Sequence, residues 1–456
     1  MNQVNSLLQP QGPAGWPVIG NLTDFFAQSP LAFLTKLQTE FGDVASFSIF
    51  GRKSVLIAHP NDIERVLLET GKYFHKGYKT IFAVHLVLGN GLASSEGEFW
   101  RQQRKLAQPA FHHERISGYA DTCIHFSKRL LQSWQDGEVR DVHQDMMLLM
   151  QQIVAKILLD TDVTGEAQDV GQAFDVIQQE MSAEVMGWRL FLPSFVSSPG
   201  RVRLRAAVDN LDRILQSTIK KRRTTSNNHN DLLTMLMEAR DEDGNGMTDR
   251  QLRDEIMTFY FAGFETTANS LSWVWDLLSR NHNIRAKLEA ELEQILARKY
   301  PTFSDLRTLS YTEAIFKETL RLYPPGWSIG RFTSEDVEIN GYTVSKGTEI
   351  WMSSWLTQRD PRWFSNPETF IPDRWLDGLE KRIPRYAYFP FGGGARTCIG
   401  NSLAQLAFTL ILSTIAQNYH LEVLPDQIVE PEAGVTLRPK HGIKVRLHHQ
   451  WSSVRG

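Results

Sequence analysis

FPFGGGARTCIG, residues 389–400, places three consecutive glycines and an arginine beside one of only two cysteines in a chain of 456 residues. Glycine adopts backbone conformations that are closed to other residues, and it lets a bulky group approach the chain closely. The stretch therefore predicts an open loop that carries Cys398, and neither an ordinary helix nor an ordinary strand. The other cysteine, Cys123, lies in a predicted helix, DTCIHFSKRL, and fits an inert buried thiol.

The segment that follows the loop, NSLAQLAFTLILSTIAQNY (401–419), predicts an apolar helix that is buried nearly all round. Gly400 opens this helix, so the sulfur of Cys398 lies just before a helix N-terminus. Free backbone N–H groups and the helix dipole favour a thiolate at such a position. We therefore interpret Cys398 as a nucleophile or a metal ligand.

The composition narrows the class of protein. With 42% hydrophobic residues and 25 phenylalanines, the chain can bury a large core. Lys and Arg number 49 against 52 Asp and Glu, and this balance argues against a general nucleic-acid binder. Two cysteines allow no disulfide framework and no CxxC zinc site, which is typical of a reducing compartment. The first residues, MNQVNSLLQPQGPAGWPVIGNL, contain no basic segment before a long apolar run. We therefore expect a cytoplasmic protein without a signal peptide or a transmembrane anchor.

The secondary-structure pattern predicts a mainly α protein with a small β-sheet region, an α+β fold. DVASFSIFGRKSVLIAHP (43–60) predicts a hairpin, and VEINGYTVSKGTEIWMS (337–353) predicts further short strands. From about residue 98 to 300 the pattern is mostly helical. The longest predicted helix follows DEDGNGMTD (241–249), where Thr248 and Gln251 fit a capping box, and it continues to about Asn281.

The loop resembles the haem-binding loop of the cytochrome P-450 family, F-x-x-G-x-R-x-C-x-G. Every fixed position matches: Phe391, Gly394, Arg396, Cys398 and Gly400. The resemblance implies haem b with the Cys398 thiolate as axial ligand of the iron, and a further cofactor contact at Gly392. It also implies a single cytochrome P-450 domain over residues 1–456, with the haem between the long helix and the cysteine loop.

AGFETTA (262–268) lies midway along the long helix. From the residues alone, the hydroxyl of Thr266 can bond back to the carbonyl of Ala262 and bend the helix, which opens a groove. The segment resembles the family's A-G-x-[DE]-T oxygen-activation motif. The resemblance implies that Glu265 and Thr266 are the catalytic acid–alcohol pair, and that Ala262 and Gly263 lie beside the cofactor.

Glu318 and Arg321 in KETLRLYPP are three residues apart on one helix face. By themselves they would fit a solvated surface ion pair. FIPDRW (370–375) adds Arg374 in a match to the family's Pro-x-Arg-aromatic segment. The resemblance implies a buried cluster of Glu318, Arg321 and Arg374 that holds the loop under the haem, a structural role.

WRQQR (100–104) fits the family's W-x-x-x-R pattern, which places Trp100 and Arg104 one helical turn apart. The resemblance implies that both reach the haem propionates, together with Arg331 and Arg396, because a planar guanidinium binds carboxylates bidentately. The helix after Cys398 departs from the family, with Leu403 and Ala407 where Phe and Glu are frequent.

By family position, a substrate pocket is expected from several segments whose side chains are large and apolar. Core packing is an equally good interpretation for each residue, but collectively they predict a lipophilic substrate such as a fatty acid, a terpenoid or another hydrophobic natural product. Lys76, Lys79 and Arg189 slightly favour an acid. The predicted pocket residues are Phe82, Leu86, Trp188, Phe264, Trp327, Ile329 and Val435.

The resemblance implies a haem-thiolate monooxygenase that uses O₂ and NAD(P)H-derived electrons to hydroxylate or epoxidise its substrate. Because 456 residues leave no room for a fused reductase, we expect an external redox partner, a ferredoxin or flavodoxin with its reductase, and a monomer. Three alternatives remain: a haem-thiolate isomerase or dehydratase, a peroxygenase, and a non-enzymatic haem sensor. The retained Glu265–Thr266 pair disfavours the isomerase and the sensor.

Overall fold

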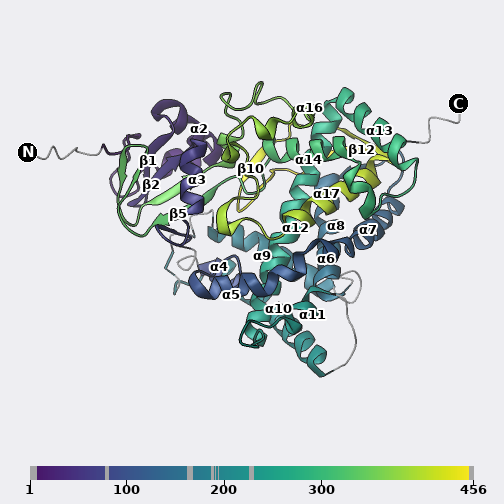
Figure 1. Ribbon diagram of the computed structural model, residues 1–456, viewed down its shortest axis with the longest axis horizontal. Helices are drawn as coiled ribbons and strands as arrows, with labels where there is room; N and C mark the ends of the chain where they lie inside the picture. Colours follow the sequence, from purple (N-terminus) through teal and green to yellow (C-terminus); the bar gives the residue numbers. More distant parts are fainter. Residues whose placement is uncertain are drawn as a thin grey trace, which may run out of the picture. The chain divides into compact units, whose positions relative to one another are not determined.

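The computed structural model describes residues 8–77, 82–161, 168–185, 189, 192–193, 195–224 and 231–450. The chain divides into two compact units. The first comprises Met1–Gly77, Lys317–Cys398 and Pro431–Arg438, and the second Tyr78–Phe316, Ile399–Glu430 and Pro439–Gly456. Helices predominate and the sheets are small, so the predicted α+β class is confirmed (Figure 1).

The first unit is built on a five-stranded sheet with the strand order β1-β2-β8-β5-β3. β1 (Val44–Ile49) and β2 (Arg52–Ile57) pair antiparallel, which confirms the predicted hairpin. Its two turn residues, Phe50 and Gly51, have positive φ angles of 49° and 74°. Both central residues of a type I′ turn require such angles, and this turn matches the twist of the strands.

Around this sheet the first unit carries short helices and two small hairpins. One hairpin, β6–β7, turns at Asn340 and Gly341, whose φ angles are again positive, 49° and 80°. The remaining elements of this unit are α1 (Leu22–Ala27), α2 (Pro30–Phe41), α3 (Pro60–Leu68), β3 (Phe74–His75), β5 (Ile329–Thr333), β6 (Val337–Ile339), β7 (Tyr342–Val344), β8 (Glu349–Met352), α15 (Ser354–Thr357), α16 (Asp373–Leu376), η5 (Leu379–Lys381), η6 (Arg385–Ala387), η7 (Gly394–Arg396), β10 (Pro431–Ala433) and β11 (Leu437–Pro439).

The second unit is organised around α12 (Asp249–Arg280), a helix of 32 residues. Thr248 and Gln251 form the predicted capping box, so the start and the length of this helix are confirmed. α8 (Val142–Leu159) packs along it, and α17 (Asn401–Ala416) also contacts it. Because neighbours cover it on several sides, α12 is buried through most of its length.

α17 confirms the predicted apolar helix in most of its length. Every residue from Leu406 to Ala416 is buried, whereas Asn401 and Ser402 at its start are exposed. The other elements of the second unit are α4 (Phe82–Leu88), α5 (Gly97–Ala107), η2 (Gln108–Phe111), α6 (His113–Ser117), α7 (Ala120–Gln132), β4 (Val139–Asp141), α9 (Gln168–Val185), α10 (Pro199–Thr224), α11 (Leu232–Glu238), α13 (His282–Leu296), η4 (Phe303–Arg307), β9 (Tyr419–Val423) and β12 (Lys444–His449). α14 (Ser310–Leu322) begins in this unit and ends in the first.

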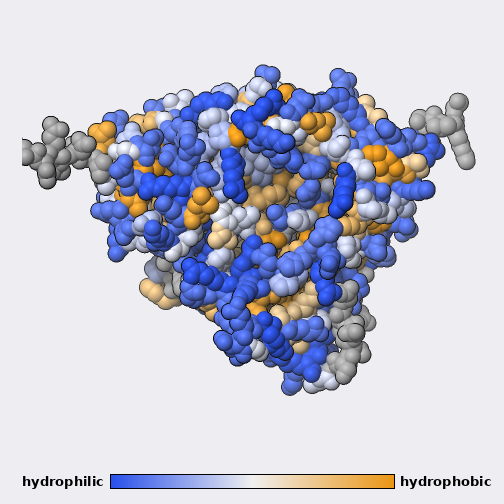
Figure 2. All heavy atoms as spheres, viewed as in Figure 1, coloured by the Kyte–Doolittle hydropathy of each residue, from blue (hydrophilic) through white to orange (hydrophobic). Residues whose placement is uncertain are grey.

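Hydrophilic side chains cover most of the face shown in Figure 2, and hydrophobic ones occur there as separate small groups. The apolar residues counted in the sequence are largely buried instead. None of the helices in the described part of the chain combines the length and the apolar composition that a membrane span requires.

Candidate active site

The glycines of the cysteine loop, residues 389–398, are required by close packing. Gly392 and Gly394 have φ angles of 68° and 63°. A Cβ atom on Gly394 would lie 2.3 Å from the carbonyl oxygen of Leu67, and one on Gly393 would lie 2.2 Å from the ring of Tyr386. No larger residue fits at these two positions without moving the backbone or the ring.

Hydrogen bonds within the first unit hold this loop in shape. The backbone N–H of Cys398 donates to the carbonyl of Phe391 at 3.0 Å. The hydroxyl of Thr397 donates to the carbonyl of Gly394 at 2.8 Å, and the N–H of Gly394 donates to the Tyr386 hydroxyl at 3.2 Å. The backbone around Cys398 is therefore fixed by the loop's own contacts.

The two cysteines have opposite surroundings. Cys398 is exposed, two residues before Gly400, the N-cap of α17. Cys123 is completely buried, and burial raises the pKa of its thiol to about 12. An accessible sulfur on a fixed glycine loop, ahead of a helix N-terminus, has the chemistry of an iron ligand. Cys398 therefore fits the haem thiolate, and Cys123 is a core residue.

The middle of α12 carries an accessible stripe, although the helix is buried through most of its length. Ala262 is exposed, and Gly263 and Thr266 are half-buried. These residues lie at i, i+1 and i+4, and so share one face of the helix. The Thr266 hydroxyl donates to the carbonyl of Ala262 at 2.8 Å, which is the predicted back-bond. Glu265, the acid beside it, is buried.

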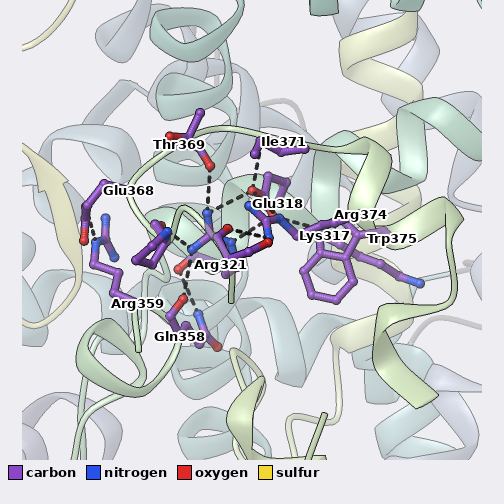
Figure 3. Close-up of polar contacts among 12 residues, drawn as sticks. Lys317, Glu318, Arg321, Gln358, Arg359, Glu368, Thr369, Ile371, Arg374 and Trp375 are labelled. Atoms are coloured by element: carbon purple, nitrogen blue, oxygen red, sulfur yellow. Dashed lines mark hydrogen bonds and ion pairs between the residues drawn. The ribbon is translucent and has the colours of Figure 1, made fainter. Parts of the chain in front are cut away.

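The structure brings Glu318, Arg321 and Arg374 together in the first unit (Figure 3). Glu318 and Arg321 are both 0% exposed, and two parallel hydrogen bonds of 2.9 Å join the carboxylate to the guanidinium. Arg374 Nε donates to Glu318 Oε1 at 3.2 Å. The surface ion pair that the sequence alone would allow is therefore wrong, and the buried cluster implied by the resemblance is present.

Further hydrogen bonds connect this cluster to Trp375 and to the backbone around it. Glu318 also accepts the indole N–H of Trp375 at 2.8 Å and the backbone N–H of Ile371 at 2.9 Å. Arg321 donates to the carbonyls of Gln358, Pro367 and Thr369. A charge pair with so many additional hydrogen bonds is adequately satisfied in a buried site.

The residues predicted for the propionates lie in both units. In the second unit, Trp100 is buried and Arg104 half-buried on α5, and Arg104 Nε donates to Gln108 at 3.2 Å. In the first unit, Arg331 is buried in β5, and its Nε donates to the Thr70 hydroxyl at 3.1 Å. Arg396, also in the first unit, is half-buried in η7.

The predicted pocket residues differ in accessibility. Ile329 and Val435 are partly accessible, as are Phe82 and Leu86. Phe264 is 0% exposed and packs against Tyr260 and Phe261, and Trp327 is buried with its indole N–H donating to the Gly434 carbonyl at 2.9 Å. These contacts favour a core role for Phe264 and Trp327. Trp188 lies outside the described residues.

Of the charged residues expected to favour an acidic substrate, Lys76 is half-buried and stays a prediction, whereas Arg189 has ion-pair partners within the chain. Arg189 is paired with Glu180 at 2.8 Å and lies 3.6 Å from Glu184. Glu180 also binds Arg203, and Glu184 also binds Arg201, so three arginines share these two carboxylates. Arg189 is held by these contacts and does not by itself indicate a carboxylate ligand. Lys79 lies outside the described residues.

Sequence reasoning missed three residues of the first unit: Trp375, Tyr386 and Gln358. Trp375 stands within the quoted segment FIPDRW, where an indole beside a buried carboxylate could have been anticipated. Tyr386 and Gln358 gave no signal, because their partners become neighbours only through the tertiary fold.

A mainly helical chain with an accessible cysteine on a glycine loop, and an acid–alcohol pair inside a long helix, has the features of a haem-thiolate protein. The family model of cytochrome P450 matches residues 10–447. The chain belongs to the cytochrome P450 family.

Bacterial relatives are similar over nearly the whole chain. Cyclooctat-9-en-7-ol 5-monooxygenase of Streptomyces melanosporofaciens is 33% identical over 91% of this chain and 89% of its own length. Cyclooctatin synthase of the same species is 31% identical over 93% and 92%, respectively. Pentalenene oxygenase of Streptomyces avermitilis is 33% identical over 95% and 96%.

The protein is therefore a cytochrome P450 monooxygenase, with haem iron bound by a cysteine thiolate, that inserts one atom of O₂ into a hydrophobic organic substrate. Its electrons derive from NAD(P)H and reach it from a redox partner. The predicted family, reaction class and cofactor are thereby confirmed.

Proposed function

We propose that this enzyme oxygenates a terpenoid, a cyclic hydrocarbon or alcohol of that class, by hydroxylation or epoxidation. The relatives named above act on such compounds by their names, cyclooctat-9-en-7-ol and pentalenene. The accessible side chains of Ile329 and Val435 are apolar, and Arg189, which was expected to favour an acid, is already ion-paired with Glu180.

The observation that carries the proposed mechanism is the accessible stripe of α12. When bound, the haem supplies O₂ activation, and Cys398 would provide the thiolate that holds its iron. The Thr266 hydroxyl donates its hydrogen bond to the Ala262 carbonyl, so its lone pairs remain available to accept a hydrogen bond from a water molecule and to orient it. Glu265, the adjacent acid, would return a proton to this water each time the water has given one up. An isomerase or dehydratase has no need of this pair, and neither has a haem sensor.

Other residues would hold the cofactor. Arg104, Arg331 and Arg396 would bind the propionates with Trp100, because a guanidinium pairs well with carboxylates. Phe391, Gly392 and Gly400 would shape the loop beside the iron ligand, and Ala262 and Gly263 would lie against the haem. The Glu318–Arg321–Arg374 cluster would stabilise the segment that precedes the loop.

The electron donor that we propose is a ferredoxin or flavodoxin with its reductase. A groove of about 440 Å³ in the second unit is lined by Trp100, Arg101, Arg104, Lys105, Gln108, Pro109 and His112. Arg101 and Lys105 are its exposed cations. Each is ion-paired with a glutamate of this chain, and acidic groups of a partner could take the place of these glutamates. We further propose one P450 domain over residues 1–456, supported by a family match that covers both units. A monomer and a cytoplasmic location stay predictions.

The experiment is a titration of the ferric, haem-loaded enzyme with four classes of compound: cyclic terpenes, fatty acids, steroids and aromatic acids. We expect only the terpenes to convert the iron from low to high spin, which reports displacement of water. With surrogate ferredoxin and reductase, the same compounds should consume NAD(P)H and yield oxygenated product. A spin shift and product with fatty acids alone would contradict the substrate class, and rearranged product without NAD(P)H would contradict the monooxygenase assignment.

A further inference from the structure

A buried amide connects the end of α14 to the start of the cysteine loop. Gln358 is 0% exposed. Its Oε1 accepts the backbone N–H of Phe389 at 3.0 Å, and its Nε2 donates to the carbonyls of Leu320 and Arg321 at 2.9 and 3.1 Å. Only one orientation of the amide satisfies all three partners, because oxygen cannot donate and NH₂ cannot accept. The side chain is therefore fixed by its contacts.

The two hydrogen bonds donated by the Gln358 amide satisfy backbone carbonyls that cannot find a donor within α14. The carbonyls of Leu320 and Arg321 lie in the last turn of α14, and four residues later each would find Pro324 or Pro325. Proline has no N–H to donate, so neither carbonyl can be satisfied by continuing the helix. The two N–H groups of Gln358 supply the missing donors.

The backbone of Gln358 is held as firmly as its side chain. Its N–H donates to the carbonyl of Ser354 at 3.0 Å, and its own carbonyl accepts Arg321 Nη1 at 2.9 Å (Figure 3). Gln358 is thus bonded to the Glu318–Arg321–Arg374 cluster through its backbone carbonyl, and to Phe389 through its side chain. It therefore links the position of Phe389 to that of the cluster.

Phe389 is the first residue of the cysteine loop, and two backbone hydrogen bonds connect this part of the loop to the backbone of Cys398. The carbonyl of Phe389 accepts the N–H of Gly392 at 2.9 Å, and the carbonyl of Phe391 accepts the N–H of Cys398 at 3.0 Å. A displacement of Phe389 would therefore move the turn that carries Cys398.

We propose that Gln358 is a positioning residue for the axial ligand. Its oxygen fixes where the cysteine loop begins relative to α14, and its NH₂ group fixes the end of that helix. The inference rests on the proposed role of Cys398 as the ligand of the haem iron.

The chain offers a matched control. Asn21 is also a buried amide that accepts one backbone N–H, from Ser48 at 3.0 Å, and donates to two carbonyls, those of Pro13 and Ala14, both at 3.4 Å. Gln358→Leu and Asn21→Leu each remove one such set of bonds, but only the first set reaches the cysteine loop.

The experiment compares these variants as haem-loaded full-length proteins. Two quantities are measured at a temperature well below unfolding: the fraction of the ferrous–CO complex with the thiolate-type band, and Tm. Both variants should lose Tm. We expect a severalfold loss of the thiolate fraction in Gln358→Leu only. Gln358→His should restore most of it, because a neutral imidazole retains one acceptor and one donor.

Gln358→Glu tests the role of the amide oxygen separately from that of the NH₂ group. It remains informative if Gln358→Leu does not fold. A glutamate keeps an acceptor for the Phe389 N–H, so the thiolate fraction should stay near that of the wild type while Tm falls. A severalfold loss of the thiolate fraction relative to the wild type would contradict the proposal.

Two outcomes are distinguishable in the same data. A wild-type protein without the thiolate-type band would overturn the proposed ligand and this inference with it. A normal band in the wild type and an equal thiolate fraction in Gln358→Leu and Asn21→Leu would overturn the inference alone, and would leave Gln358 a contributor to stability.

Discussion

The hydroxyl of Thr266 donates a hydrogen bond to the carbonyl of Ala262, one turn earlier in α12, at 2.8 Å. This hydrogen bond fixes the orientation of the hydroxyl, so its lone pairs lie at a part of the helix that remains accessible. Since most of α12 is buried, this is a local exception to its packing.

Thr266→Ala removes the alcohol and should leave substrate binding intact. We expect product formation to fall by about a hundredfold or more, since a side chain positioned for proton transfer typically contributes about 10²–10⁴-fold. NAD(P)H would still be consumed, with the reducing equivalents appearing as peroxide. Thr266→Ser, which keeps the hydroxyl, should stay close to wild type, and the buried neighbour Thr267 provides the control variant Thr267→Ala. Unchanged coupling in Thr266→Ala would remove Thr266 from the proton path.

Cys398→Ser should abolish the thiolate-type ferrous–CO spectrum, because a serine hydroxyl is not a thiolate ligand. Cys123→Ser is the matched control, because Cys123 is fully buried in α7 and lies outside the cysteine loop. Its haem-loaded form should keep the spectrum of the wild type. The assignment of the axial ligand would be wrong if the first variant kept that spectrum.

Glu318→Gln should destabilise the protein strongly, because it leaves Arg321 and Arg374 buried without their counter-charge. Breaking a buried ion pair in this way costs about 3–5 kcal/mol. The neighbouring pair Lys317–Glu380 is partly exposed at 3.2 Å, and Glu380→Gln should cost only about 0–1 kcal/mol. Denaturant unfolding of both variants measures the two costs. Equal values would show that the cluster contributes no more than a surface pair.

The buried carboxyl of Glu255 predicts a pH dependence of stability. Burial is the main cause that raises its pKa from 4.5 to about 8, although the N–H of Leu92 donates to it at 3.0 Å. Below the lower value the carboxyl is protonated in both states. Between the two values only the unfolded chain is ionised, so this group lowers stability as pH rises towards 8.

Glu255→Gln removes the ionisation. Relative to wild type, the free energy of unfolding of the variant should increase between about pH 5 and 8, by up to a few kcal/mol, because one pKa unit corresponds to about 1.4 kcal/mol. Unfolding measured across this range gives the difference directly, with the exposed Glu114→Gln as control. A difference that does not vary with pH would show that Glu255 ionises normally.

Most of the fold could be predicted from residues that lie close together in the sequence. Thr248 and Gln251 marked the start of α12 because a capping box is complete within four residues. Likewise, the bond from Thr266 to Ala262 follows from their spacing in a helix. The family motif pointed to the cysteine loop because its residues are contiguous in the chain.

What could not be predicted depends on contacts between distant segments. Gln358 bonds Phe389, 31 residues away, and nothing in its neighbours distinguishes it from a surface glutamine. It could not be predicted either that Gln358 would satisfy two carbonyls of α14. Pro324 and Pro325 indicate only that this helix ends before them. The accessibility of the pocket residues likewise depends on packing, and Phe264 shows that an apolar residue at the variable position of a motif can belong to the core.

The contrast between the two cysteines has a practical consequence. With a pKa of about 12 and no solvent exposure, Cys123 is closed to alkylating reagents in the folded protein. Cys398 is accessible, so a maleimide at neutral pH has one target, and an iron-bound sulfur would be shielded from it. The fraction of chains that gain the mass of the maleimide would then equal the fraction without cofactor. Haem loading could therefore be measured by mass spectrometry without adding a cysteine to the sequence.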